Sequence, residues 1–306
     1  MKFAISIPQW VDDGTFNPAA MRRYLNRAEE LGFAGAWTLE QVLGRVPQFG
    51  PLETLSYAAA CTERIRLGCA VFITTLHSPV HLAKSLSTLD QISLGRLDVG
   101  IATGGGHRMF SAFGVDRSTY IARFTEGLDL MRALWTEPEV NFKGRFWQLE
   151  GAAMEPKPFQ KPTPPVWFGG SRPPALRRAV RLGDGFFGAG SSTTEQFVQQ
   201  VQVVREELAR QDRDPADFPI AKRVYIAVDD DAGRAHDRMT AALHRMYPFL
   251  PGDITAVSVF GSPPDCVAGL RQVADAGAGM ILLNPLFDDA EQMDRLAAEV
   301  MPELDA

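Results

Sequence analysis

The sequence has few cysteines, and their placement suits neither cross-linking nor metal binding. Cys61, Cys69 and Cys266 lie far apart, so neither a disulfide framework nor a CxxC metal site is available. No window reaches the roughly 20 apolar residues that a membrane-spanning helix needs. The N-terminal KFAISIP is typical of a strand and lacks a charged leader. These absences favour a cytoplasmic protein with inert thiols and no membrane partner.

An excess of charge of one sign is also missing. The 31 basic side chains stand against 37 acidic ones, which gives a formal net charge of −6 without a basic run. A nucleic-acid partner normally requires a concentrated basic surface. We therefore expect no nucleic-acid partner and look instead for a small-molecule site.

Several catalytic signatures are absent. The residue five after Gly104 is Met109, so no GxGxxG fingerprint arises, and no GxSxG elbow occurs. No lysine directly follows a predicted strand, which disfavours a Schiff-base aldolase. The histidines lack carboxylate or cysteine partners at ligand spacing, so we expect no metal site; they are His77, His81, His107, His236 and His244.

What the sequence does contain is a repeated strand–helix pattern. Arg66 to Ile73 is continuously apolar, which is typical of a strand buried on both faces of a parallel sheet. Pro79 opens a helix whose apolar positions recur every three or four residues, and Gly95 ends it. The next strand, Arg96 to Ala102, leads to the glycine run 104–106. Glycine amides at such a strand end can approach a ligand closely.

The same unit recurs along the chain and predicts eight strands, each followed by a helix. The strands are expected at Lys2–Pro8, Ala34–Leu39, Arg66–Ile73, Arg96–Ala102, Val166–Gly169, Gly185–Gly188, Val224–Val228 and Met280–Asn284. A (β/α)8 TIM barrel of the α/β class typically occupies about 250 residues, so residues 1–306 are expected to form one domain. The proline-rich stretch 136–165, with its hairpin-like NFKGRFWQLEG, is interpreted as an insertion, and residues 247–262 as irregular.

In a TIM barrel the functional site lies beyond the C-terminal ends of the strands. Apolar, aromatic and small residues dominate these positions here, which suits a flat aromatic ligand. Two elements are typical of anion-binding sites: Gly104 to Gly106, and Gly169 to Ser171 with Arg172 beside them.

Five segments then resemble the luciferase-like monooxygenase superfamily, in that family's order and over nearly the whole chain. They are ERIRLGCAVF, HSPVHLAKSLSTLDQISLGRLDVGIATG, FGVD, GRFWQLEGAAMEPKPFQKPTPPVWFGGS and RLGDGFF. The resemblance implies a bacterial-luciferase-like barrel with an insertion, usually a homodimer. It also implies FMN or the deazaflavin coenzyme F420 as cofactor, which transfers hydride or activates oxygen.

The resemblance further implies which residues contact the cofactor. Thr103 and Gly104 would line it, Gly169 and Gly170 would hold its phosphate, and Ala189 and Gly190 would flank it. Ala70 and Val71 fall where deazaflavin-using members have a non-prolyl cis peptide bond against the back of the ring. Trp10, Gln41 and Phe110 are assigned to the substrate pocket, although Phe110 could equally belong to the core.

The proton-transfer group is left open. Several deazaflavin members have an Asp-His pair after the second strand, whereas this chain has Glu40 and Gln41. Glutamine does not titrate, so the catalytic acid or base is Glu40, His77 or His107. Glu40 could instead accept a backbone amide. Three functions remain: hydride transfer with F420, monooxygenation with FMN and a reductase partner, and non-catalytic flavin binding.

Overall fold

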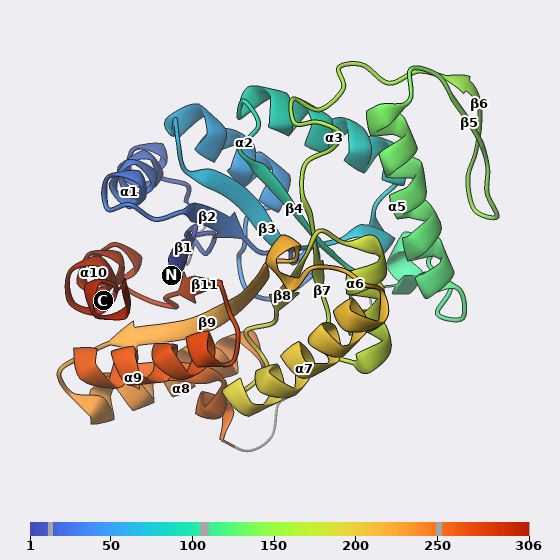
Figure 1. Cartoon of the computed structure of the whole chain (residues 1–306). Helices are drawn as coiled ribbons and strands as arrows, with labels where there is room; N and C mark the ends of the chain where they lie inside the picture. Colours follow the sequence, from blue (N-terminus) through green and yellow to red (C-terminus); the bar gives the residue numbers. More distant parts are fainter. Residues whose placement is uncertain (12–14, 105–109, 249–252, 306) are drawn as a thin grey trace.

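The computed structural model describes residues 1–11, 15–104, 110–248 and 253–305. Within them, eight parallel strands close into a barrel, because β8 pairs with β9 and β11 returns to β1. The predicted (β/α)8 TIM barrel is confirmed (Figure 1). In order around the ring, the strands are β1 (Lys2–Ser6), β2 (Gly35–Thr38), β3 (Arg66–Ile73), β4 (Leu97–Ala102), β7 (Val166–Gly169), β8 (Gly185–Gly188), β9 (Ile220–Val228) and β11 (Met280–Asn284).

Helices between the strands pack their apolar faces on the outside of the barrel (Figure 1). Local sequence fixes where they begin. Asn17 caps the first helix by accepting a hydrogen bond from the amide of Ala20, and Thr193 and Gln196 form a capping box. The helices are α1 (Pro18–Glu30), α2 (Pro51–Cys61), α3 (Pro79–Ile92), α5 (Tyr120–Thr136), α6 (Pro173–Leu182), α7 (Thr194–Arg210), α8 (Ala232–Met246), α9 (Pro263–Asp275), and the C-terminal α10 (Asp289–Arg295) and α11 (Pro302–Asp305).

Large side chains fill the part of the barrel interior that lies farther from the C-terminal ends of the strands. Trp37 packs edge-on against Trp167 at a ring-centroid distance of 6.2 Å, and Phe187 lies 4.8 Å from Trp37. Trp167 also donates its indole hydrogen to Asp98. Toward the strand ends the same interior face carries Gly100, Ala102 and Gly169 instead, because side chains alternate along a strand. The interior is therefore filled by large side chains at one level and lined by small residues at the C-terminal strand ends, which we call the mouth of the barrel.

The stretch 136–165, which the sequence analysis interprets as an insertion, lies outside the ring of barrel strands. It contains the antiparallel hairpin of β5 (Val140–Lys143) and β6 (Gln148–Ala152), which projects from the barrel in Figure 1. The proline-rich connector that follows is held to α3, where Gln160 contacts the carboxylate of Asp90.

Two details differ from the sequence-based expectation. The stretch 247–262 is not wholly irregular, since it contains a short 3-10 helix, Ile254–Val257, and strand β10 (Ser258–Gly261), which pairs with β9. Strand β9 also begins at Ile220 rather than Val224. Lys222 and Arg223 break its apolar run in sequence, yet both lie inside the fold.

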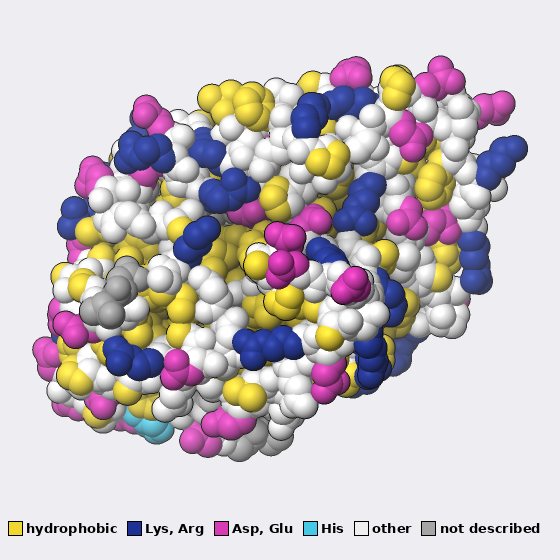
Figure 2. Space-filling model, in the orientation of Figure 1, with side chains coloured by type: hydrophobic (Ala, Val, Ile, Leu, Met, Phe, Trp, Pro, Cys, Tyr) yellow, Lys and Arg dark blue, Asp and Glu magenta, His cyan; other side chains and the backbone are white. Residues whose placement is uncertain are grey.

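The described residues contain no helix with the length and hydropathy needed to span a bilayer. On the face seen in Figure 2, basic and acidic side chains are interspersed around apolar ones.

Candidate functional site

A β-bulge in β3 shapes the mouth of the barrel. Cys69 pairs with Val99, whereas the next paired residue is Phe72, so Ala70 and Val71 together oppose Gly100. A Cβ on Gly100 would lie well inside 3.0 Å of the Cys69 carbonyl oxygen, closer than real Cβ atoms approach. The Ala70–Val71 peptide bond is cis, which confirms that prediction. The bulge thus fits only against a residue without a side chain.

The predicted cofactor residues of three neighbouring strands meet at this bulge. A Cβ on Gly169 would lie 3.0 Å from the Val71 side chain, so the end of β7 directly faces the bulge. Gly104 follows β4 with a φ of +73°, a conformation that glycine adopts most easily. The carbonyl of Thr103 accepts a hydrogen bond from the Thr75 hydroxyl at 2.9 Å.

A buried lysine fixes the loop after β8, which carries Ala189 and Gly190. Lys222 is 2% exposed and donates hydrogen bonds to the carbonyls of Ala189 and Ser192, at 2.5 and 2.9 Å. Burial and the neighbouring Arg223 lower the pKa of this ammonium to about 7. Lys222 points toward α7, 5.8 Å from the Phe197 ring, so it positions the loop and does not face the mouth.

The mouth fits a planar cofactor with a phosphate-bearing tail. Small residues leave room beside the bulge, and a Cβ at Gly169 would occupy part of that space. The Thr74 hydroxyl and the Arg223 Nε are buried without a hydrogen-bond partner among the described residues. Such groups are satisfied when a ligand binds them.

Glu40 and His77, which the sequence suggests as separate candidates, form a pair. His77 Nε2 lies 2.7 Å from Glu40 Oε1, and the amide of Ile73 donates to Glu40 Oε2 at 2.5 Å. The Glu40 side chain is 3% exposed and that of His77 24%. Glu40 therefore accepts a hydrogen bond from a backbone amide, which is one of the roles that the sequence analysis left open. It also contacts His77, whose side chain is partly exposed to solvent.

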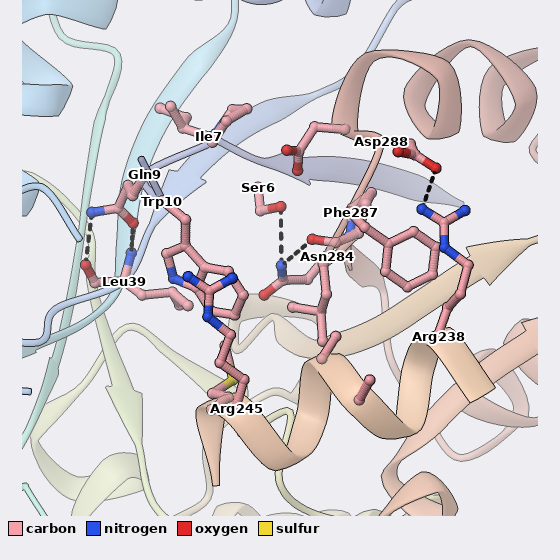
Figure 3. A pocket seen from close by; sticks show the side chains of 17 residues that line it. Ser6, Ile7, Gln9, Trp10, Leu39, Arg238, Arg245, Asn284, Phe287 and Asp288 are labelled. Atoms are coloured by element: carbon pink, nitrogen blue, oxygen red, sulfur yellow. Dashed lines mark hydrogen bonds and ion pairs between the residues drawn. The ribbon is translucent and has the colours of Figure 1, made fainter. Parts of the chain in front are cut away.

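A cavity of about 540 Å³ opens beside this region, between the ends of β1 and β11 and one face of α8 (Figure 3). Trp10 lies on one side, 5.5 Å from the Arg245 guanidinium, and Phe287 on the other. Asn284 is oriented by donating to Ser6 Oγ at 3.1 Å and to the Pro285 carbonyl, and its Oδ1 is buried with no hydrogen-bond partner among the residues described. The cavity thus offers aromatic walls and a hydrogen-bond acceptor.

The same cavity contains a perturbed carboxyl group. Burial raises the pKa of Asp289 to about 6, and the neighbouring Asp288 acts in the same direction. A raised pKa means that the folded state binds this proton more tightly than the unfolded chain does. The stability that this group contributes is therefore present below pH 4 and lost as the pH rises through 6.

We expect Asp289→Asn to raise the free energy of unfolding at pH 7 by about 1–2 kcal/mol, because the variant removes the cost of a buried charge. At pH 4 the two proteins should differ little. Urea unfolding at both pH values measures the difference. An equal change at both would mean that the effect does not come from ionisation.

Other predicted site residues lie apart from the mouth or outside the described residues. Phe110 is 1% exposed and packs with Leu76 and Val115, which is the core position that one interpretation allowed. The Gln41 amide lies over Gly44 in the loop after β2, and Gln41 is not part of the cavity lining. His107 falls outside the described residues. Among the described residues no cluster of three potential metal ligands occurs.

Comparison with known proteins identifies the family. The model of the family "Luciferase-like monooxygenase" matches residues 1–277, so the chain belongs to that family. A relative in Intrasporangium calvum, F420-dependent glucose-6-phosphate dehydrogenase, is 27% identical over 94% of this chain and 96% of its own length. The FMNH(2)-dependent dimethylsulfone monooxygenase of Pseudomonas putida is 32% identical over 51% of this chain and 44% of its own length. The crystal structure of the monooxygenase RslO1 from Streptomyces bottropensis superposes with a TM-score of 0.84, at 26% identity, over 99% of this chain and 100% of that one.

Sequence reasoning did not single out Arg223 and Asp289, and it placed Asn284 at the rim without giving it a role. Asn284 was visible as the last residue of a predicted strand, so its position at the rim could have singled it out. Arg223 carried no such signal, because the strand was predicted to begin after it. Asp289 follows a loop and resembles any acidic residue near the start of a helix.

Proposed function

We propose that this protein is an oxidoreductase in which coenzyme F420, bound in the mouth of the barrel, exchanges hydride with a small organic substrate. The observation that carries the proposal is the cluster of small residues at the strand ends, where the bulge at Ala70 and Val71 lies directly against Gly169. Similarity over 94% of the chain to an F420-dependent dehydrogenase favours this cofactor.

Each group at the mouth would have a defined task. The amides of Gly169 and Gly170 precede α6 and would hold the phosphate of the cofactor tail. Val71 would support one face of the ring, and Lys222 would keep the loop of Ala189 and Gly190 in place. The bound cofactor supplies or accepts the hydride.

Glu40 and His77 would handle the proton that accompanies the hydride. Their 2.7 Å contact allows a proton to be shared, and the partial exposure of His77 provides exchange with solvent. The substrate would occupy the cavity at Trp10, with Asn284 Oδ1 accepting a hydrogen bond from it.

A second candidate is an FMN-dependent monooxygenase that receives reduced flavin from a reductase. The identities of 32% to the dimethylsulfone monooxygenase and of 26% to RslO1 favour it. Both candidates place a tricyclic ring at the same position, so one binding experiment separates them.

That experiment is titration of the purified protein with F420 and with FMN, followed by fluorescence. We expect F420 to bind more tightly, and Gly169→Val to weaken binding at least about tenfold by filling the space beside Val71. Gly279→Ala, where a Cβ would make only an ordinary contact at 3.8 Å, is the matched control. Tighter binding of FMN would favour the second candidate, and binding of neither cofactor would refute both.

A further inference from the structure

Arg223 is a cation on the interior face of the barrel. It lies on β9 with its side chain on the interior face, two residues before Tyr225. Among the described residues it forms no ion pair within 4.0 Å, although other arginines with restricted exposure, such as Arg66 and Arg295, do. A charge without a partner in such a place is costly unless something else binds it.

The hydrogen bonds of Arg223 are also incomplete. A guanidinium has five N–H donors. Nη2 donates to the Tyr225 hydroxyl at 3.0 Å, Nη1 reaches the Ala70 carbonyl only at 3.5 Å, and Nε has no partner in the part of the chain that the structure describes. The Tyr225 hydroxyl in turn lies 2.6 Å from that of Tyr247.

Arg96, at the opposite end of the barrel, provides the comparison. It too lacks a carboxylate within ion-pair distance in the described part of the chain. Yet its three nitrogens make five hydrogen bonds, to Ser93 O, Thr62 Oγ1, Ile65 O, Ala59 O and Thr62 O, at 2.7–3.1 Å. A guanidinium with a purely structural role in this protein is thus saturated by carbonyl and hydroxyl oxygens. Arg223 has donors left over.

The position of Arg223 indicates what those donors face. Its guanidinium reaches the carbonyl of Ala70 in the bulge, and a Cβ on Gly190 would lie 2.6 Å from its Nε. Arg223 therefore lies between two of the segments proposed to enclose the cofactor ring. The residue is intermediate in exposure, although its Nε atom is buried.

We infer that Arg223 is the counter-ion for the negative charge that the reduced ring carries, and so favours the reduced over the oxidised cofactor. This inference rests on the proposed function. Reduced flavin and deazaflavin rings lose a proton near neutral pH, and a cation beside the ring stabilises the resulting anion. Tyr225 and Tyr247 hold the guanidinium in position and leave its charge unneutralised.

The test compares the affinities of the wild-type protein, R223Q and R223K for oxidised and reduced cofactor, under anaerobic conditions, with whichever of F420 and FMN binds. We expect R223Q to lose at least about tenfold more affinity for the reduced than for the oxidised form, which lowers the midpoint potential by about 30 mV for a two-electron couple. R223K should retain most of the preference. R96Q, the matched control, should leave the ratio unchanged even if it destabilises the fold.

Two further outcomes show whether Arg223 interacts with the negative charge on the ring or with the phosphate of the cofactor tail. Repeating the titration with riboflavin or the tail-free deazaflavin should preserve the effect of R223Q on the ratio. If the effect disappears with the tail-free ring, Arg223 binds the phosphate and the inference is wrong; equal weakening of both redox forms also overturns it. Failure of the wild-type protein to bind either cofactor overturns the proposed function and this inference with it.

Discussion

Replacement of Gly100 by alanine is expected to lower the free energy of unfolding by about 3 kcal/mol, at the upper end of the usual cost of overpacking. The new Cβ would clash with the carbonyl oxygen of Cys69, and that atom is backbone, which cannot rotate away as a side chain does. The bulge at Ala70 and Val71 would have to shift, so cofactor affinity should fall as well. Chemical denaturation and cofactor titration measure the two effects.

The control for this substitution is Gly279→Ala, which should raise the free energy of unfolding instead of lowering it. Nothing lies nearer than 3.8 Å to a Cβ there, and the change restricts the unfolded chain. We expect a gain of about 0.5 kcal/mol in stability. A Gly100→Ala protein as stable as the wild type, with unchanged cofactor affinity, would show that the bulge does not depend on this contact.

The second large effect is expected for Glu40→Gln, which should lower the turnover number by about a hundredfold. Glutamine retains an oxygen for the Ile73 amide but cannot exchange a proton with His77. The rate is measured from cofactor absorbance with a substrate that the wild-type protein turns over.

Glu29→Gln separates catalysis from stability. Glu29 accepts the amides of Arg64 and Ile65 at the start of β3, whereas Glu40 accepts an amide at the end of the same strand. Both substitutions should cost about 1–3 kcal/mol in stability, because each weakens hydrogen bonds to a charged group. Only Glu40→Gln should slow turnover. An equal loss of rate in both variants would assign Glu40 a structural role alone.

The fold could be predicted from the sequence because its strands are short apolar runs separated by capped helices. Each boundary has a local cause, such as Asn17 before α1 or Gly95 after α3. Strand β10 was missed because it lies outside the ring of eight repeated strand–helix units and pairs with β9 alone among the described strands. The start of β9 was missed because Lys222 and Arg223 are typical of a surface, and nothing in the sequence reveals the carbonyls that accept from the lysine.

The residues of the candidate site that lie at strand ends could be predicted from the sequence, whereas the contacts between them could not. Strand ends converge in a parallel barrel, so Glu40, Thr103 and Gly169 could be assigned to the rim without knowing any distance. The contact of Glu40 with His77, 37 positions later in the chain, could not be predicted, since it depends on how the short helix Thr74–Leu76 turns after β3. The raised pKa of Asp289 depends on its burial, which is a property of the packed protein alone.

Strand β9 pairs with β8 along one edge and with two strands, β11 and β10, along the other. Up to Tyr225 it is bonded to β11, and from Tyr225 onward β10 pairs with it as well, beyond the last β11 partner. The wall of the barrel consequently divides at this residue, and the cavity lies beside the division, between β11 and α8. Displacement of α8 together with β10 would thus widen the cavity for a broader substrate, while the hydrogen bonds that close the ring of strands stay intact.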